Sequence, residues 1–92
     1  MLLSEEEIAD RLNGIPGWRR EGSELIRDYA FADFNQAMNF INLVAEEAEA
    51  ADHHPDMLLH GWNKVRLMLM THSEGGLTVK DFALAERIET LI

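Results

Sequence analysis

Apolar residues recur at helical spacing in three segments of the chain. The clearest segment is 33–51, where one face of a helix is formed by Phe34, Ala37, Met38, Ile41, Val44, Ala45 and Ala48. A shorter helix is predicted over about 4–13, and a third over 78–92. The pattern therefore predicts three helices, separated by stretches with a different period.

Local capping signals support these helices. Ser4 with Glu7, and Thr78 with Asp81, have the spacing of a capping box, in which the hydroxyl and the carboxylate each accept a bond from an otherwise unpaired backbone N–H. The first helix is expected to end at Asn13-Gly14, a pair that is typical of a left-handed helix end.

Between the helices, apolar and polar residues alternate with the period of a strand. Segments 18–21 and 24–31 are predicted to form a hairpin through Gly22-Ser23, because glycine suits the first central position of a two-residue turn. A second pair of strands is predicted at about 57–62 and 64–71, with a tight connection between them.

The predicted order is helix, two strands, helix, two strands, helix. No linker divides the 92 residues, so we expect a single α+β domain over 1–92, with helices covering one face of an antiparallel sheet. A chain of this length buries only about 60 to 65% of the surface that its unfolded form exposes. A second copy of the chain covering the free face or an edge is therefore expected, as a homo-oligomer.

Composition excludes several classes of function. With 17 acidic and 8 scattered basic residues, the net charge of −9 disfavours binding to nucleic acid. The absence of cysteine removes disulfides, thiolate catalysis and cysteine metal sites. No apolar stretch approaches the roughly 20 residues of a membrane helix, and the N-terminus lacks the pattern of a secretory signal. We therefore expect a cytoplasmic protein with no membrane or nucleic-acid partner.

Three of the four histidines stand at junctions between predicted elements, where sites are often built. His53 and His54 follow the long helix, and His72 ends the last strand. Glu49 lies four residues before His53, so a helix that continued this far would let the carboxylate orient the imidazole. Pro55 favours an extended conformation at His54, so the two adjacent imidazoles should leave the helix end in different directions.

The residues alone leave three interpretations of this cluster open. It can be a polar helix exit without chemistry, or a centre for proton transfer, since an imidazole in a model peptide has a pKa near 6.5. The histidines with Asp52 or Glu49 also provide enough ligands for zinc. Adjacent histidines seldom chelate one ion, however, and the histidine pair at i, i+4 that is typical of zinc sites is absent.

The cluster belongs to a longer pattern that closely resembles the signature of the pterin-4a-carbinolamine dehydratases. The matching positions are Glu49, His53, His54, Pro55, Trp62, His72 and Asp81. Other segments that are similar to this family are Gly17-Trp18, Phe31-x-Asp33-Phe34, Asn63-Lys64-Val65, Thr71-His72 and Gly76-Leu77-Thr78. The resemblance covers nearly the whole chain, from about Ser4 to Ile92.

The resemblance implies an α-β-β-α-β-β-α fold with a four-stranded antiparallel sheet, assembled as a homodimer or homotetramer. It also implies a hydro-lyase, 4a-hydroxytetrahydrobiopterin dehydratase, that needs no metal or other cofactor. Its small-molecule substrate is the 4a-hydroxytetrahydropterin that an aromatic amino acid hydroxylase leaves behind. Loss of water gives the quinonoid dihydropterin, and two imidazoles on opposite sides of one ring carbon suit that reaction.

The family's functional residues carry over to named positions. The catalytic residues are expected to be His53, His54 and His72, and the substrate-binding residues Asp52, Thr71, Ser73, Glu49 and Asp81. Proton transfer is assigned to His53 and His72, with the acid and base roles left open, and orientation of the pterin to His54. Ser73 departs from the acidic residue of some relatives.

Some of these positions have a second explanation. Glu49 can cap the end of the long helix, and Asp81 can cap the start of the last one. Trp18 and Trp62 can line the pocket or pack in the core.

Two other functions also stay open. The first is a protein-interaction module, because some vertebrate members of the family are dimerisation cofactors of a homeodomain transcription factor. The second is a protein that binds a pterin without turnover.

Overall fold

Every predicted helix and strand forms, in the predicted order. The computed structural model describes residues 1–92, and its elements are α1 (Glu5–Leu12), β1 (Arg19–Glu21), β2 (Glu24–Ala30), α2 (Phe34–Ala51), β3 (Asp56–His60), β4 (Lys64–Leu69) and α3 (Val79–Glu89). The predicted α+β fold is confirmed. None of the three helices is long and apolar enough to cross a membrane.

Both predicted capping boxes are present. The side chains of Ser4 and Thr78 cap α1 and α3, and the carboxylates of Glu7 and Asp81 accept bonds from the N–H groups of these caps. The left-handed end predicted for α1 is wrong, because Asn13 has a φ of −63°. Successive i to i+3 bonds from residues 13, 14 and 15 close this helix end instead, so its carbonyls need no left-handed residue.

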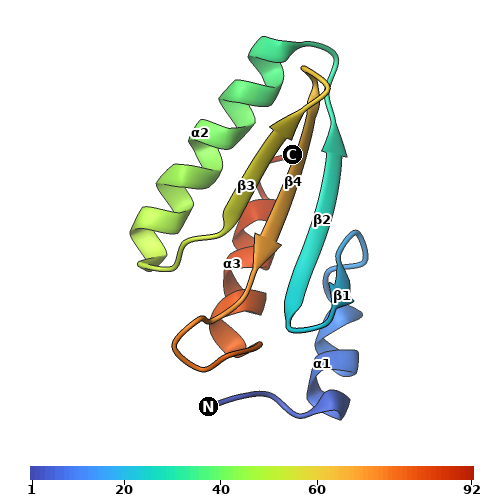
Figure 1. Ribbon diagram of the computed structural model, residues 1–92, viewed down its shortest axis with the longest axis vertical. Coiled ribbons are helices and arrows are strands. Elements are labelled where there is room, and N and C mark those ends of the chain that lie inside the picture. The colour runs from blue at the N-terminus through green and yellow to red at the C-terminus, as the bar shows by residue number, and fades with distance from the viewer.

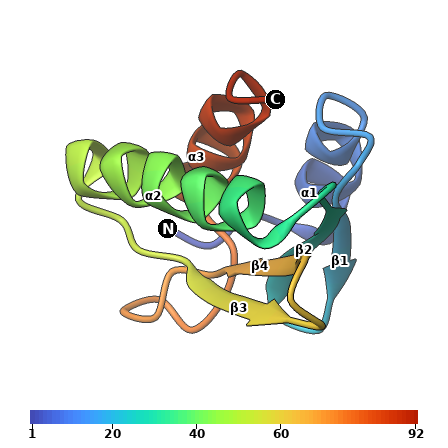
Figure 2. The ribbon, with the colours of Figure 1, turned by 90° about the horizontal axis from the view of Figure 1, so that it is seen from above.

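The four strands form one antiparallel sheet in the order β1-β2-β4-β3. All three helices lie on one side of it (Figures 1 and 2), as predicted. Gly22 has a φ of +60° in the turn that joins β1 to β2, a conformation that glycine adopts without strain. The β3–β4 turn lies at the opposite end of the sheet from the loop that follows β4 (Figure 1).

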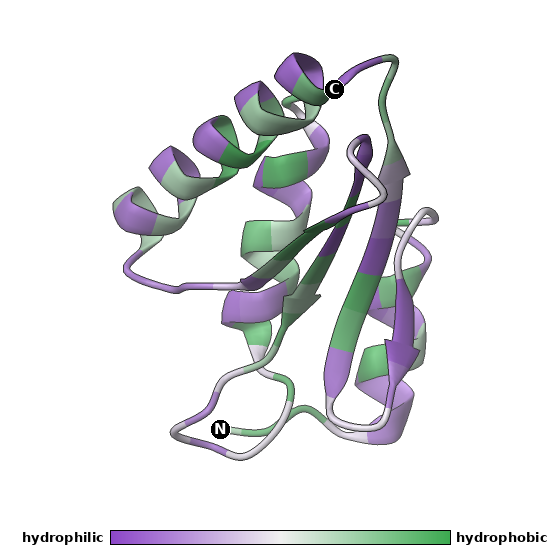
Figure 3. Ribbon diagram, turned by 45° about the horizontal axis from the view of Figure 1, so that its top comes forward, coloured by the Kyte–Doolittle hydropathy of each residue, from purple (hydrophilic) through white to green (hydrophobic).

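The core fills the space between the sheet and the helices. Along β2 a hydrophobic stretch lies between hydrophilic ones, and hydrophobic and hydrophilic stretches follow one another along the turns of α2 (Figure 3). Fully buried residues of the two central strands include Leu25, Val65, Leu67 and Leu69. Trp18 is 5% exposed and belongs to this core, so its core interpretation is confirmed.

Two aromatic positions differ from the prediction. Phe34, expected on the buried face of α2, is 50% exposed at the first turn of the helix. The buried stripe contains Phe40 instead, which lies three residues after Ala37 and four before Val44. Trp62 is 63% exposed at the β3–β4 turn and belongs neither to the core nor to the hollow that the histidines line.

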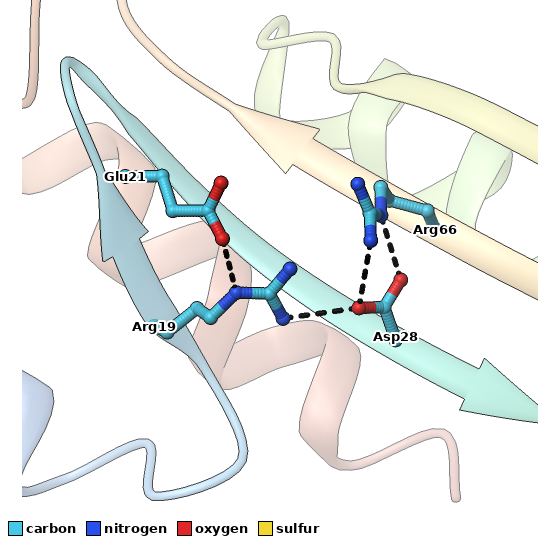
Figure 4. Close-up of polar contacts among 4 residues, drawn as sticks. All are labelled: Arg19, Glu21, Asp28 and Arg66. Carbon is cyan, nitrogen blue, oxygen red and sulfur yellow. Dashed lines mark hydrogen bonds and ion pairs between the residues drawn. The ribbon is translucent and has the colours of Figure 1, made fainter.

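The face of the sheet without helices carries a network of charged side chains (Figure 4). Asp28 on β2 accepts hydrogen bonds from Arg66 Nε on β4 at 2.7 Å and from Arg19 Nη1 on β1 at 3.0 Å. Arg19 also pairs with Glu21. Ile26 lies opposite Arg19 and is only 4% exposed. The long charged side chains therefore shield an apolar residue on the open face.

This network should add little to stability, because its members are partly exposed. The guanidinium of Arg66, and then that of Arg19, hold the pKa of Asp28 below its usual value of 3.8. A carboxyl group with a lowered pKa stabilises the fold at pH values above its pKa in the unfolded state. This stabilisation is lost as the pH falls through the pKa of the group in the folded state. We expect Asp28→Asn to cost about 1 kcal/mol or less at neutral pH in urea unfolding, and nothing in acid.

The matched control is Asp56→Asn, because Asp56 lies on the same face of the sheet without an ion pair. A loss of more than about 2 kcal/mol in Asp28→Asn alone would contradict the view that the network is weak.

Candidate active site

The end of α2 directs the first two histidines. Asp52 has φ 50° and ψ 44°, the left-handed conformation that glycine usually supplies at this position. The N–H of Asp52 donates to Glu49 O at 3.2 Å and that of His53 to Ala48 O at 3.1 Å, which is the Schellman arrangement. The helix therefore stops before His53, and the chain leaves in a new direction.

This exit changes the partner of Glu49. The prediction that Glu49 orients His53 is wrong, because the helical spacing between them is broken at Asp52. Glu49 instead pairs with Nε2 of His54, and both side chains are largely exposed. The two adjacent imidazoles have different partners on different sides of the chain, which agrees with the expected effect of Pro55.

His53 turns inward and binds Asp81, the third residue of α3. Its Nε2 lies 2.6 Å from Asp81 Oδ1, and Asp81 is completely buried. The other carboxylate oxygen accepts bonds from the N–H of Thr78 at 2.9 Å and from Thr71 Oγ1 at 2.8 Å. The two interpretations of Asp81 are thus compatible, because one oxygen caps the helix while the other holds a histidine.

This network assigns the tautomer of His53. A carboxylate with two donors on one oxygen acts as an acceptor on the other, so Nε2 of His53 carries a proton. The second ring nitrogen, Nδ1, has no partner within the protein. Nδ1 is therefore the nitrogen of His53 that is free to form a hydrogen bond with a ligand.

His72 and Ser73 lie in a tight loop between β4 and α3. The loop is closed by pairing of Thr71 with Gly76, whose backbone bond is 2.9 Å, and by a bond of the same length from Gly75 N–H to Thr71 O. Gly75 has a φ of +75°, which explains a glycine there. Thr71 is buried while His72 and Ser73 are exposed, so the loop presents these two side chains outward.

The end of α2 and this loop enclose a hollow of about 250 Å³. Its lining consists of Asp52, His53, His54, Met70, Thr71, His72, Ser73 and Lys80. All predicted site residues except Glu49 and Asp81 line it, and these two lie behind it, bonded to His54 and His53. Sequence reasoning missed Met70 and Lys80, and the only signal for Lys80 was its place beside Asp81.

A larger hollow of about 360 Å³ adjoins the first and shares Thr71, Ser73 and Lys80 with it. It contains no histidine, and the N-terminal residues Leu2 and Leu3 form much of its wall. The smaller hollow is therefore the better candidate for chemistry. No group of three or more His, Cys, Asp or Glu side chains is arranged to hold a metal ion.

Comparison with known proteins identifies the family to which this chain belongs. The family described as Pterin 4 alpha carbinolamine dehydratase matches residues 1–91. The chain belongs to the pterin-4a-carbinolamine dehydratase family. A relative from Thermomicrobium roseum, provisionally named a pterin-4-alpha-carbinolamine dehydratase, is 48% identical over 89 residues. The match covers 97% of this chain and 95% of the relative.

Two solved structures share the dehydratase fold. One, described as a transcriptional coactivator/pterin dehydratase from Brucella melitensis, has a TM-score of 0.93 and 32% identity. The match covers 99% of this chain and 98% of that one. The other is described as a pterin dehydratase-like protein that is a RuBisCO assembly factor in the alpha-carboxysome. It has a TM-score of 0.68 and 26% identity, over 82% of this chain and 88% of that one. Both structural neighbours are thus described by a non-enzymatic role, one of them together with the name pterin dehydratase.

Proposed function

We propose that this protein is a hydro-lyase that removes water from a 4a-hydroxytetrahydropterin to give the quinonoid dihydropterin. In this role it would help to recycle tetrahydrobiopterin for aromatic amino acid hydroxylases. The observation that carries the proposal is the pairing of His53 with the buried Asp81 at one wall of a hollow that His72 also lines. Membership of the dehydratase family supports it.

The reaction needs two proton transfers and no electron donor or acceptor. The C4a–O bond breaks as the hydroxyl gains a proton and leaves as water, and loss of the N5 proton leaves a C=N bond between N5 and C4a. A base and an acid on opposite sides of the ring lower both barriers. His53, through Nδ1, and His72 are assigned these two roles, in either order.

The remaining residues of the hollow are assigned to binding. A pterin presents an amino group and a ring N–H along one edge, and a carboxylate such as that of Asp52 suits these donors. The hydroxyl of Ser73 and the backbone at Thr71 offer further contacts along the loop. His54, held by Glu49, is assigned to orienting the ring.

The decisive experiment follows the decay of freshly generated 4a-hydroxytetrahydropterin by ultraviolet absorbance. We expect the wild type to accelerate decay in the presence of a chelator, and His53→Ala or His72→Ala to lower that acceleration by about 100-fold or more. The matched control is His60→Ala, since His60 is exposed on β3 and lies outside the hollow. Circular dichroism checks that each variant is folded.

Two results would contradict this mechanism. Absence of acceleration by the wild type would exclude the dehydratase function, and activity abolished by the chelator would mean that the histidines hold a metal ion. His72→Ala is the cleaner variant, because His72 is exposed and forms no side-chain hydrogen bond, whereas His53→Ala leaves Asp81 buried without its partner.

A protein-interaction module is the second candidate. The descriptions of the two structural neighbours, a coactivator and an assembly factor, favour it. This function predicts a stable complex with a purified partner that survives replacement of all three histidines of the hollow. Tight binding of a dihydropterin without turnover would instead identify a non-catalytic pterin binder.

A further inference from the structure

Lys80 borders the histidine hollow and both hollows beside it. It lines the hollow of about 250 Å³ with the histidines, and the adjoining hollow of about 360 Å³. It also lines a third, of about 170 Å³, between the end of α2 and α3, which His53 and Arg87 share. A substituent that extends from a ring bound among the histidines into either neighbouring hollow therefore passes Lys80.

The Lys80 ammonium is free, although the chain is rich in acids. No carboxylate lies within 4 Å of it, whereas five of the six arginines have a carboxylate partner at this distance. Three other carboxylates have partners of their own: Asp81 is paired with His53, Glu74 with the N-terminal amine, and Glu47 with Arg87. Asp52 lines the same hollow without a partner and is not paired with Lys80 either.

The fold does not explain a lysine at this position. Lys80 is the second residue of α3, and the first turn of a helix favours acidic side chains, as the three glutamates at the start of α1 illustrate. A lysine here lowers the stability of the helix instead of raising it. The side chain is also exposed, so it is not needed for packing. A role toward a ligand accounts for both facts.

We propose that Lys80 is a specificity residue that favours pterins with an anionic group, a carboxylate or a phosphate, on the side chain of the ring. This inference rests on the proposed function, because it places the pterin ring among the histidines. The net charge of −9 repels an anionic substrate at long range. A free cation at the junction of the three hollows offsets that repulsion where the side chain of the substrate lies.

The test compares three stable 7,8-dihydropterins with the same ring and a neutral hydroxyalkyl, a carboxylate or a phosphate side chain. Dissociation constants are measured by calorimetry for the wild type, Lys80→Met and Lys64→Met. We expect the wild type to bind the anionic ligands about tenfold more tightly than the neutral one. The ratio should fall towards one in Lys80→Met and, by screening, at high salt.

Lys64→Met is the matched control, since Lys64 is also exposed, lies outside all three hollows, and has no ion pair. It removes the same charge and should keep the ratio of the wild type. A preference for one of the two anions identifies the group that Lys80 binds.

The outcomes separate this inference from the proposed function. If the wild type binds all three ligands equally, or if Lys80→Met weakens all three by the same factor, Lys80 does not select an anion, and the dehydratase proposal still stands. If the wild type binds none of the three, the pterin site itself is wrong and the role of Lys80 fails with it.

Discussion

Replacement of Asp81 by alanine is expected to lower the free energy of unfolding by about 3 to 5 kcal/mol. The carboxylate is fully buried and is bonded to the N–H of Thr78, the hydroxyl of Thr71 and the ring of His53. Its removal leaves the N–H of Thr78 and the ring of His53 without an acceptor, while the hydroxyl of Thr71 keeps only its contact with Thr78 Oγ1. Each buried unpaired group costs about 1 to 3 kcal/mol. Urea unfolding followed by circular dichroism measures the loss.

The matched control is Asp33→Ala. Asp33 also caps a helix, by accepting a bond from Gln36 N–H, but it is exposed and bonds no histidine. Loss of an exposed cap costs about 1 kcal/mol. Equal losses in Asp33→Ala and Asp81→Ala would show that Asp81 acts only as a cap.

Asp81→Asn separates the effect on His53 from the effect on stability. The amide oxygen can take the place of the oxygen that caps α3, and this orientation turns the NH₂ group towards His53. Nε2 of His53 would then accept a hydrogen bond from this NH₂ group, and the ring proton would move to Nδ1. A protonated Nδ1 cannot act as a base towards a ligand in the hollow. We expect a folded variant with a large loss of dehydratase activity, and ¹⁵N chemical shifts of the His53 ring report the tautomer.

Replacement of Glu89 by alanine is expected to cost about 2 to 4 kcal/mol of unfolding free energy. Glu89 Oε1 accepts bonds from Trp18 Nε1 at 2.8 Å and from Tyr29 Oη at 3.4 Å, and lies 3.2 Å from Arg27 Nη1. Burial, followed by the charge of Glu89, raises the pKa of Tyr29 far above its usual value, so its hydroxyl stays protonated. Without Glu89, a buried indole N–H and a half-buried guanidinium lose their acceptor.

Glu86→Ala is the control for this prediction, because Glu86 lies on the exposed side of the same helix and forms no ion pair. It should change stability by no more than about 0.5 kcal/mol. A comparable loss in both variants would mean that helix α3, and not the cluster around Glu89, is responsible.

A second substitution tests the same cluster from the other side. The guanidinium of Arg27 packs on Gly17 so closely that a Cβ added there would lie 1.2 Å from Arg27 Nη1. Gly17→Ala must therefore displace Arg27 from Glu89. Glu89→Ala and Gly17→Ala both break the same contact, that of Arg27 with Glu89. The double variant should therefore lose less stability than the sum of the losses in the two single variants.

The fold follows closely from the sequence, because its main signals are local. A capping box joins residues three apart, such as Ser4 and Glu7, and the hairpin turn depends on the backbone freedom of Gly22. Alternation along 24–31 places Leu25 and Tyr29 on the side of the helices. Element order and fold class could therefore be predicted, while some ends, such as that of α1, could not.

Most residues around the hollow, all but Met70 and Lys80, could also be named in advance, but from the family pattern and not from their spacing. Spacing paired Glu49 with His53, and the left-handed turn at Asp52 overturned this, because one positive φ redirects every residue that follows. A helix-end signal of this kind is weak in the sequence, since aspartate seldom takes the place of glycine there.

The contacts between polar side chains that lie far apart in the sequence were decided by tertiary structure alone. Asp81 meets His53 across 28 positions of the chain, and Glu89 meets Trp18 across 71. Lys80 reaches the hollow only because α3 begins beside the end of α2. The sequence by itself determined the helices, the strands, their order and the caps, since these depend on neighbours within one turn. The partner of each buried polar side chain depended on how the helices pack over the sheet, which no local signal specifies.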